Sequence, residues 1–392
     1  MNLRLRNLLK NIGAFGFGLV LVSLFLGSVE FFFRLNETHH WLKERTVDFP
    51  TRKDPYQFDT SKLEYLKNLE PYSGVQDFDD PDDYHHAFDF SHCVAKALKL
   101  DPYWIGIPNC RARVTLKKAH SHRTVYDTYY SFESHGLRVI PAAKSNSENF
   151  LLFLGCSFTW GEGVSDENTF ANQITKGFSG FNGFNLGMGG YGPNSNLAVL
   201  ENGKLDIRMQ AIKGNNGIAV YTYIDDQLRR LLGSASWIGN SDSLTDPYFT
   251  LRNQRLTRNG SFQSGRPFRT FIYSQLSKLA LLRYLKLDPP GIDEADIEFF
   301  VSVIKEMQSI LVSQYHVKRF IFSAFSNPSL YMERLKPKLE REGIEVFDFS
   351  TFPAYEITKG RNLNFGNGHP TALGYKLYSD LFLFEAARRK TY

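Results

Sequence analysis

Hydrophobic and polar positions divide the chain into an apolar N-terminal run, a polar stretch, and a long region where apolar runs alternate with helical patterns. Residues 150–154 are five consecutive apolar residues, which is typical of a strand buried on both faces of a sheet. Further strands are predicted at 184–188, 217–224, 317–323 and 344–349, with helices at about 167–178, 193–212, 227–232, 271–287, 293–315 and 371–388. Because strands and helices alternate after residue 149, we expect a three-layer α/β/α domain around a mostly parallel five-stranded sheet.

The apolar N-terminal run predicts a transmembrane helix. Residues 12–33 contain one ionisable residue, Glu30, and their 22 positions suffice to cross a hydrocarbon core of about 30 Å. Arg4, Arg6 and Lys10 precede the run, so the positive-inside rule places residues 1–11 in the cytoplasm and the rest of the chain outside. A cleavable signal peptide is the alternative, but the run is long for an h-region and lacks a convincing A-x-A site. In a Gram-negative cell, the predicted arrangement is a single-pass inner-membrane protein with a periplasmic domain.

Two regions follow the predicted anchor. Residues 34–148 are interpreted as a tether and a small β-rich subdomain, because residues 111–140 alternate between polar and apolar positions as hairpin strands do. Residues 149–392 form the predicted main domain. A polar, turn-rich segment at about 234–270, with a predicted hairpin, interrupts it as an insertion or lid.

Cysteine usage agrees with an oxidising compartment. Cys93 and Cys110 lie 17 positions apart in an aromatic, loop-rich stretch and are predicted to form a disulfide; two unpaired buried thiols are the alternative. Cys156, next to a strand end, is interpreted as a packed thiol rather than a nucleophile.

Composition excludes some function classes. The net charge of +5 comes from 46 basic and 41 acidic residues, and no basic stripe or recognition-helix pattern indicates nucleic acid binding. His85, His86 and His92 lie near an acidic loop at 77–83 but lack metal-ligand spacing, so they are interpreted as surface residues. The sequence implies no metal and no organic cofactor.

Four chemically suggestive pieces fall at or just after predicted strand ends. They are Ser157, the glycine-rich stretch 185–192, the pair Asp225–Asp226, and the late N-G-H-P of residues 367–370. Since the carboxyl ends of parallel strands meet at one edge of a sheet, where α/β folds place their chemistry, we expect these pieces to lie together. An alternative is that the serine only caps a helix.

The block around Ser157, G-x-S-F-T-x-G-x-G-V, resembles the nucleophile block of the SGNH (GDSL-type) hydrolases, and the order of the four pieces resembles the family's blocks. Residues 126–139 also resemble the lead-in of membrane-anchored members. The resemblance covers residue 149 onwards and implies an SGNH/flavodoxin-like fold. It further implies that Ser157 attacks an ester carbonyl, that His369 removes its proton, and that the amides of Ser157 and Gly190 bind the oxyanion.

The chain departs from the family pattern at three positions. Gly366 stands where the acid of Asp-x-x-His is expected, so Asn367 is the candidate for orienting His369, with a distant acid such as Asp348 as the alternative. Asp225 stands about where the family's oxyanion asparagine falls, and an ionised carboxylate cannot donate a hydrogen bond. Cys156 replaces the usual aspartate before the nucleophile.

Several neighbouring residues have two interpretations. Trp160 and Tyr191 flank the predicted site and are candidates for stacking on a sugar, with core packing as the alternative. Asp226, Arg229 and Arg230 are better explained by a local ion pair at a helix start than by an anionic substrate. Tyr375 is expected in the core.

Two functions therefore compete. The first is a membrane-anchored, extracytoplasmic serine esterase or O-acyltransferase acting on O-acyl esters, such as acetyl groups on envelope glycans, or on a lipid ester. The second is a non-catalytic glycan-binding or assembly protein that kept the fold and lost the acid and the oxyanion donor.

Overall fold

A parallel five-stranded sheet forms the centre of the main domain. The computed structural model describes residues 27–30, 84–88, 93–96, 104–118, 122–325, 329–352, 363–365 and 368–391. The strands are β6 (Asn149–Leu154), β7 (Asn182–Asn185), β8 (Asn216–Tyr223), β11 (Val317–Ala324) and β12 (Glu345–Asp348), in the order β12-β11-β8-β6-β7. All four pairings are parallel, which confirms the predicted sheet.

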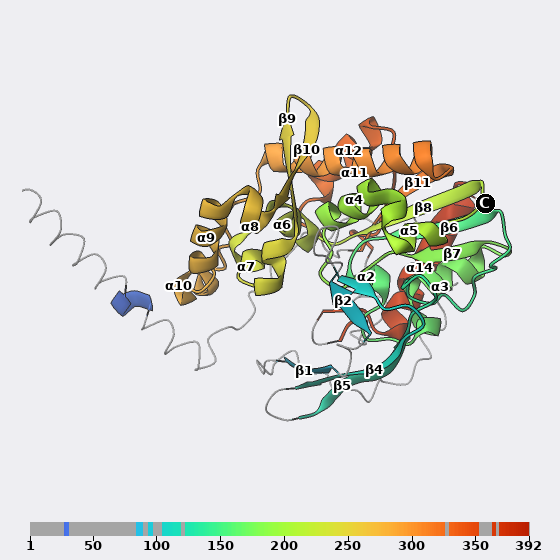
Figure 1. Ribbon diagram of the computed structural model, residues 1–392, viewed down its shortest axis with the longest axis horizontal. Coiled ribbons are helices and arrows are strands. Elements are labelled where there is room, and N and C mark those ends of the chain that lie inside the picture. Colours follow the sequence, from blue (N-terminus) through green and yellow to red (C-terminus); the bar gives the residue numbers. More distant parts are fainter. Residues whose placement is uncertain are drawn as a thin grey trace, which may run out of the picture.

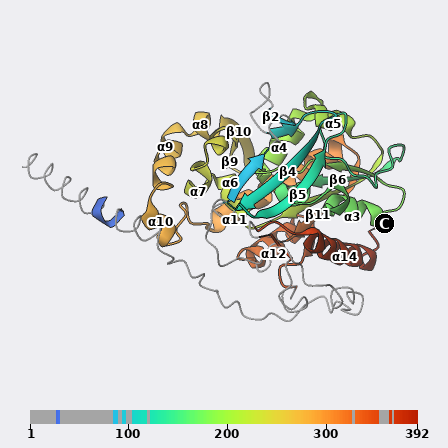
Figure 2. The same cartoon turned by 90° about the horizontal axis from the view of Figure 1, so that it is seen from below.

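Helices cover both faces of this sheet (Figures 1 and 2). One face carries α3 (Phe170–Gly177) and α14 (Ala372–Arg388), which pack on each other, and the other carries α4 (Pro193–Asn202), α6 (Asp226–Leu232), α11 (Glu294–Gln314) and α12 (Met332–Arg341). The strand residues between these layers, such as Phe150 to Leu154, are fully buried. The predicted three-layer arrangement is therefore present.

One predicted helix, 193–212, is broken in the structure. It ends as α4 at Gly203, whose φ of 54° lies in the left-handed region. A 3₁₀ turn, η3 (Gly203–Leu205), follows, and Asp206 then caps the short α5 (Ile207–Ala211) by accepting a hydrogen bond from the Arg208 amide. The glycine and the new cap together stop one helix and start another.

The N-terminal subdomain is β-rich, as predicted. A three-stranded antiparallel sheet joins β1 (Tyr84–Phe88), β4 (Arg111–Lys118) and β5 (Thr124–Ser131), and β2 (Val94–Lys96) pairs with β3 (Trp104–Gly106). The predicted disulfide between Cys93 and Cys110 is confirmed, with the two Cα atoms 5.5 Å apart. The tether that was predicted from residue 34 lies outside the described residues.

The insertion is longer than predicted. It contains the predicted hairpin of β9 (Pro247–Arg252) and β10 (Arg255–Ser261), preceded by α7 (Ala235–Ile238) and η4 (Ser241–Thr245). Residues 271–287 were predicted as one helix beyond the insertion. In the structure they belong to this lobe, which continues through α8 (Phe262–Gly265), α9 (Pro267–Leu276) and α10 (Ala280–Tyr284). The lobe stands at one end of the molecule in Figure 1.

The predicted transmembrane helix lies outside the described residues except for residues 27–30, which are helical. Within the part of the chain that the structure describes, no helix combines the length and the apolar character needed to span a bilayer.

Candidate active site

Ser157 is positioned by a tight turn between β6 and the short helix α2 (Ser157–Trp160). Gly155, with a φ of 142°, makes this turn, and a Cβ at this position would lie 2.1 Å from Thr159 Oγ1. The side chain of Asn196 holds the same glycine from both sides, since its Oδ1 accepts from the Gly155 amide at 3.1 Å and its Nδ2 donates to the Gly155 carbonyl at 3.3 Å. The turn is therefore fixed by backbone conformation and by a buried amide.

His369 comes from the C-terminal loop and contacts the serine directly. Its Nε2 lies 2.7 Å from Ser157 Oγ, although 212 positions separate the two residues. The imidazole packs against the Phe158 ring, with 5.2 Å between the ring centroids. Thr371 caps α14 immediately after the loop by accepting a hydrogen bond from the Gly374 amide. The predicted meeting of serine and histidine at the carboxyl edge of the sheet is thus present in the structure.

Glu162 is the carboxylate that the structure brings to this pair. Its Oε2 lies 3.3 Å from His369 Nε2, and the two side chains are 15% and 17% exposed. The carboxylate therefore approaches the same ring nitrogen that contacts Ser157, rather than the opposite nitrogen used in a Ser-His-Asp triad. Tyr126 donates a hydrogen bond from its hydroxyl to Glu162 Oε1 at 3.2 Å, which holds the carboxylate in place.

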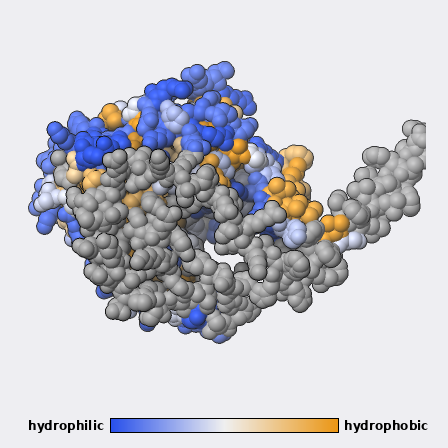
Figure 3. All heavy atoms as spheres, turned by 180° about the vertical axis from the view of Figure 1, so that it is seen from behind, coloured by the Kyte–Doolittle hydropathy of each residue, from blue (hydrophilic) through white to orange (hydrophobic). Residues whose placement is uncertain are grey.

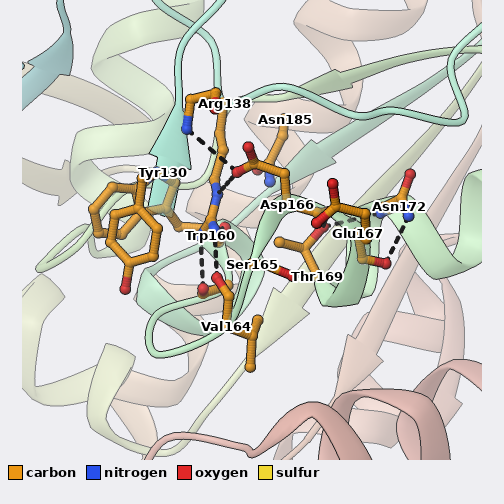
Figure 4. Close-up of polar contacts among 12 residues, drawn as sticks. Tyr130, Arg138, Trp160, Val164, Ser165, Asp166, Glu167, Thr169, Asn172 and Asn185 are labelled. Carbon is orange, nitrogen blue, oxygen red and sulfur yellow. Dashed lines mark hydrogen bonds and ion pairs between the residues drawn. The ribbon is translucent and has the colours of Figure 1, made fainter. Parts of the chain in front are cut away.

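Arg138 fixes the loop that carries Glu162 (Figure 4). Its guanidinium is buried and donates to the carbonyls of Trp160 at 2.8 Å, Gly161 at 2.6 Å and Val164 at 2.6 Å, while its Nε donates to Asp166 at 3.0 Å. These carbonyls flank Glu162 on both sides. Arg138, from the segment after β5, therefore determines the course of residues 160–166, the loop that follows Ser157 and is called the nucleophile loop below.

Strand β5 supplies the rest of the wall around this loop. Tyr126 and Tyr130 occupy the same buried face of the strand. The Tyr130 hydroxyl accepts a hydrogen bond from the Gly163 amide at 2.7 Å, and its ring lies 4.1 Å from the Arg138 guanidinium. Burial, together with the Glu162 charge, raises the pKa of Tyr126 far above its ordinary value, so this hydroxyl stays protonated and donates.

The histidine loop rests on the nucleophile loop through a close contact at Gly163. This residue has a φ of 86°, and a Cβ there would lie 2.5 Å from the Phe365 ring. Phe365 also packs on Tyr126 at 5.3 Å, and its amide donates to the His369 carbonyl at 2.7 Å. The distance between Ser157 and His369 is therefore set by loops that pack on each other.

Asp225, the candidate that stands about where the family's oxyanion asparagine falls, is hydrogen-bonded to the segment before α12. Its two carboxylate oxygens accept hydrogen bonds from the Ser329 hydroxyl and the Leu330 amide, both at 2.6 Å. These contacts tie the end of β8 to the segment that precedes α12. The carboxylate is thus engaged as an acceptor in a structural cap.

Of the two interpretations of Trp160 and Tyr191, sugar stacking or core packing, the structure supports core packing. Trp160 is 4% exposed and packs on Tyr130 with 4.8 Å between ring centroids. Tyr191 is 2% exposed, and its hydroxyl donates to the Trp104 carbonyl at 2.5 Å and accepts from Arg208 at 3.1 Å. Their rings are covered by protein.

The predicted oxyanion donors are the amides of Ser157 and Gly190, and Asn367 was the candidate for orienting His369. The amide of Ser157 lies at the first position of α2, where helix geometry leaves it without an intrahelical acceptor. Gly190 has a φ of 78°, and a Cβ at this position would lie 3.7 Å from the ring of Trp237 in the insertion. Its role as an oxyanion donor stays a prediction. Asn367 lies outside the described residues.

The remaining interpretations concern structural roles. Cys156 is fully buried and unpaired by disulfide, as predicted, and Tyr375 is in the core. Arg230 forms the predicted local ion pair with Asp226 at 2.7 Å. Asp348, the alternative acid, accepts hydrogen bonds from the amide and hydroxyl of Ser350 at 3.0 and 2.5 Å. His92 lies outside the described residues, and among the described ones no group of three metal-ligating side chains occurs.

Sequence reasoning missed Glu162 and Arg138. Glu162 lies five positions after Ser157 between two glycines, and both glycines adopt positive φ, so the turn brings the side chain back towards the helix start. A carboxylate inside the nucleophile block was the available signal. Arg138 lies inside the stretch 126–139 that resembled the family's lead-in, where an arginine among apolar residues marked a charge needing buried acceptors.

The similarity of this chain to known proteins is one of structure. No protein-family model matches the chain, and no curated protein is similar to it in sequence. Similar solved structures include a member of the lipolytic G-D-S-L family from Veillonella parvula, with 13% identity and a TM-score of 0.36, covering 61% of this chain and 99% of that one. An acetyl xylan esterase from the rumen bacterium Butyrivibrio proteoclasticus has 12% identity and a TM-score of 0.34, covering 62% and 65%.

A third similar structure is a catalytic mutant of an acetylxylan esterase from Geobacillus stearothermophilus, with 14% identity and a TM-score of 0.32, covering 61% of this chain and 94% of that one. These three structures bear the names of a G-D-S-L lipolytic protein and of acetylxylan esterases. At these identities and TM-scores the likeness assigns no substrate and no residue role to this chain.

Proposed function

We propose that this protein is a serine ester hydrolase whose nucleophile is Ser157 and whose general base is His369. The observation that carries the proposal is the 2.7 Å contact between Ser157 Oγ and His369 Nε2. A serine hydroxyl is a poor nucleophile unless a base within hydrogen-bonding reach takes its proton as the bond to carbon forms. With the imidazole proton on Nδ1, Nε2 is free to accept that proton.

The residues around the pair supply the remaining steps. Ser157 Oγ attacks the acyl carbon while its proton passes to Nε2, and the carbonyl oxygen becomes an oxyanion beside the Ser157 amide. The intermediate collapses when the protonated imidazole gives its proton to the leaving alcohol, which leaves an acyl group on Ser157. A water molecule, or a second alcohol in a transfer reaction, then attacks this acyl group with His369 again acting as base.

Glu162 replaces the missing triad aspartate in electrostatic terms. A carboxylate 3.3 Å from Nε2 attracts the imidazolium that forms during attack, while it gains little from the neutral ring. It therefore stabilises the transition state more than the ground state, which is the condition for raising kcat. The imidazole also packs against the Phe158 ring, which restricts its orientation.

The substrate and the location belong to the proposal as well. We infer that the domain acts outside the cytoplasm on O-acyl esters of envelope glycans or lipids, held at the membrane by residues 12–33. The disulfide between Cys93 and Cys110 supports an oxidising compartment. The apolar run behind a basic tail supports the anchor. A purely non-catalytic role is not favoured, because the serine and the histidine are in contact.

The proposal is tested by labelling and by hydrolysis. The full chain is treated with a fluorophosphonate probe, and we expect covalent labelling of Ser157, mapped by peptide mass spectrometry. Ser157→Ala and His369→Ala are expected to lower hydrolysis of an acetyl ester by at least about a thousandfold. Ser165→Ala, a serine in the same loop, is the matched control. Absence of labelling together with unchanged activity in both variants would remove the assigned roles.

A further inference from the structure

The insertion lobe carries an exposed surface that combines apolar and basic side chains. Within α9 and α10 and the segment that follows, six large apolar residues are 38–76% exposed, and they make up six of the eleven such residues on the described part of the chain. They are Phe268, Phe271, Ile272, Tyr284, Leu285 and Leu287. A contiguous exposed apolar surface on a folded domain marks an interaction site.

The pattern within α9 shows that this exposure has a direction. Phe268, Phe271 and Ile272 are spaced i, i+3 and i+4, so they share one face of the helix, while Thr270 on the opposite side is buried. Figure 3 shows apolar side chains gathered at this end of the molecule, beside residues 27–30. The helix therefore presents its apolar face outwards and a small polar residue to the protein.

The charged residues of this segment are all basic. Residues 266–287 contain five basic residues and no acidic residue. Arg269, Lys278, Arg283 and Lys286 are exposed, whereas Arg266 is buried. Exposed aromatic and aliphatic side chains combined with lysine and arginine are the composition of a helix that lies in the interface of a bilayer with anionic lipids.

The chain also connects this surface to the apolar N-terminal run. Glu30 accepts hydrogen bonds from the amides of Ala280 at 2.7 Å and Leu281 at 3.1 Å, at the start of α10. Glu30 is the only ionisable residue in the run 12–33 and stands three positions before its end. The start of α10 therefore lies at the outer end of the predicted anchor.

We propose that the surface formed by α9, α10 and residues 285–287 rests on the outer face of the membrane, as a second contact beside the anchor. The occupant is the lipid bilayer, because the surface adjoins the apolar run and carries the charge that complements anionic headgroups. This inference rests on the proposed membrane attachment and is independent of the esterase chemistry. Together, the anchor and this surface would fix the orientation of the domain relative to the membrane.

Fluorescence quenching of the full chain in lipid nanodiscs tests this contact. Phe271→Cys is labelled with an environment-sensitive fluorophore, and Val312→Cys, an exposed apolar position on α11, is the matched control. The native cysteines do not interfere, since two are disulfide-bonded and Cys156 is buried. Circular dichroism spectra and thermal melting of each variant, compared with the parent chain, verify that it is folded.

We expect nanodiscs containing doxyl-labelled phosphatidylcholine to quench the fluorophore at position 271 and not at 312. Quenching should increase when phosphatidylglycerol is added. Lys286→Gln, combined with Phe271→Cys, removes one positive charge from the surface. In these anionic discs we expect it to lower, about fivefold, the ratio of chains whose lobe contacts the membrane to chains whose lobe does not.

Equal quenching at both positions would overturn the proposed membrane contact of the lobe but not the predicted anchor. Protection from aqueous iodide without doxyl quenching would show that another protein or a second copy covers the lobe, which also overturns the proposal. A chain that does not stay with the discs would overturn the anchor and the surface together, whereas loss of esterase activity bears on neither.

Discussion

Replacing Glu162 by glutamine removes one charge from the site and tests its electrostatic role. The glutamine keeps the length and the hydrogen-bonding capacity towards Tyr126, so the loop held by Arg138 is expected to keep its course. What changes is the interaction with the imidazolium that forms when His369 takes the serine proton. The variant therefore separates charge from shape.

The magnitude follows from the distance of 3.3 Å between Glu162 Oε2 and His369 Nε2. Coulomb's law gives about 1 kcal/mol at the dielectric constant of water and about 5 kcal/mol at an effective value of about 20. Because both side chains are mostly buried but touch solvent, we expect an intermediate loss, about 100-fold in kcat.

The assay is the hydrolysis of a chromogenic acetyl ester over a range of pH, with Glu167→Gln as control. Glu167 is an exposed carboxylate in the same loop. A value of kcat in Glu162→Gln equal to or above that of the parent would refute the reasoning. It would mean that the carboxylate competes with Ser157 for the ring proton and slows the resting enzyme.

Three other predictions concern stability. Arg138→Met leaves buried carbonyls and Asp166 without their donor, so we expect a loss of about 3–5 kcal/mol in chemical denaturation, with kcat reduced as Glu162 is displaced; unchanged stability contradicts this. Burial alone would raise the pKa of Asp288, but hydrogen bonds from Ser236, Ser234 and Arg229 hold it below its ordinary value. Asp288→Asn should therefore lower the free energy of unfolding by about 1.5–3 kcal/mol at neutral pH. The difference in stability between variant and parent should narrow below about pH 4, because protonation of Asp288 removes its stabilising contribution from the parent. Urea denaturation at several pH values checks it. Reducing the disulfide, or Cys93→Ser with Cys110→Ser, is expected to cost about 3 kcal/mol for its 17-residue separation, read as a lower urea midpoint.

The sheet could be predicted because its strands carry their own signal. Phe150 to Leu154 are apolar at every position and are buried on both faces, which only a central strand requires. Strand β7 begins two residues and ends three residues earlier than predicted, because Asn182 and Gly183 look like turn residues while Leu186 and Met188 look like strand residues. Asn185 decides the matter, since its side chain bonds the Gly187 amide and the Thr159 carbonyl and so ends the strand.

The contact between Ser157 and His369 could be predicted because each residue lies in a local sequence block, whereas the residues that support the contact come from distant parts of the chain. Glu162 reaches His369 only because of the positive φ angles of Gly161 and Gly163. Arg138 becomes a positioning residue only when the subdomain packs on the main domain. Hydropathy also cannot distinguish an aromatic residue in a cleft from one in the core, which is why both interpretations of Trp160 stayed open in the sequence.

The contacts of Arg138 and β5 have a practical consequence for how the protein is dissected. A truncated chain beginning at residue 149 would retain every strand of the central sheet, the nucleophile and the histidine. It would lack the guanidinium that holds the carbonyls beside Glu162 and the tyrosine that orients this carboxylate. Such a fragment is expected to fold poorly and to be inactive, so the segment that precedes the α/β domain belongs to the enzyme's catalytic unit.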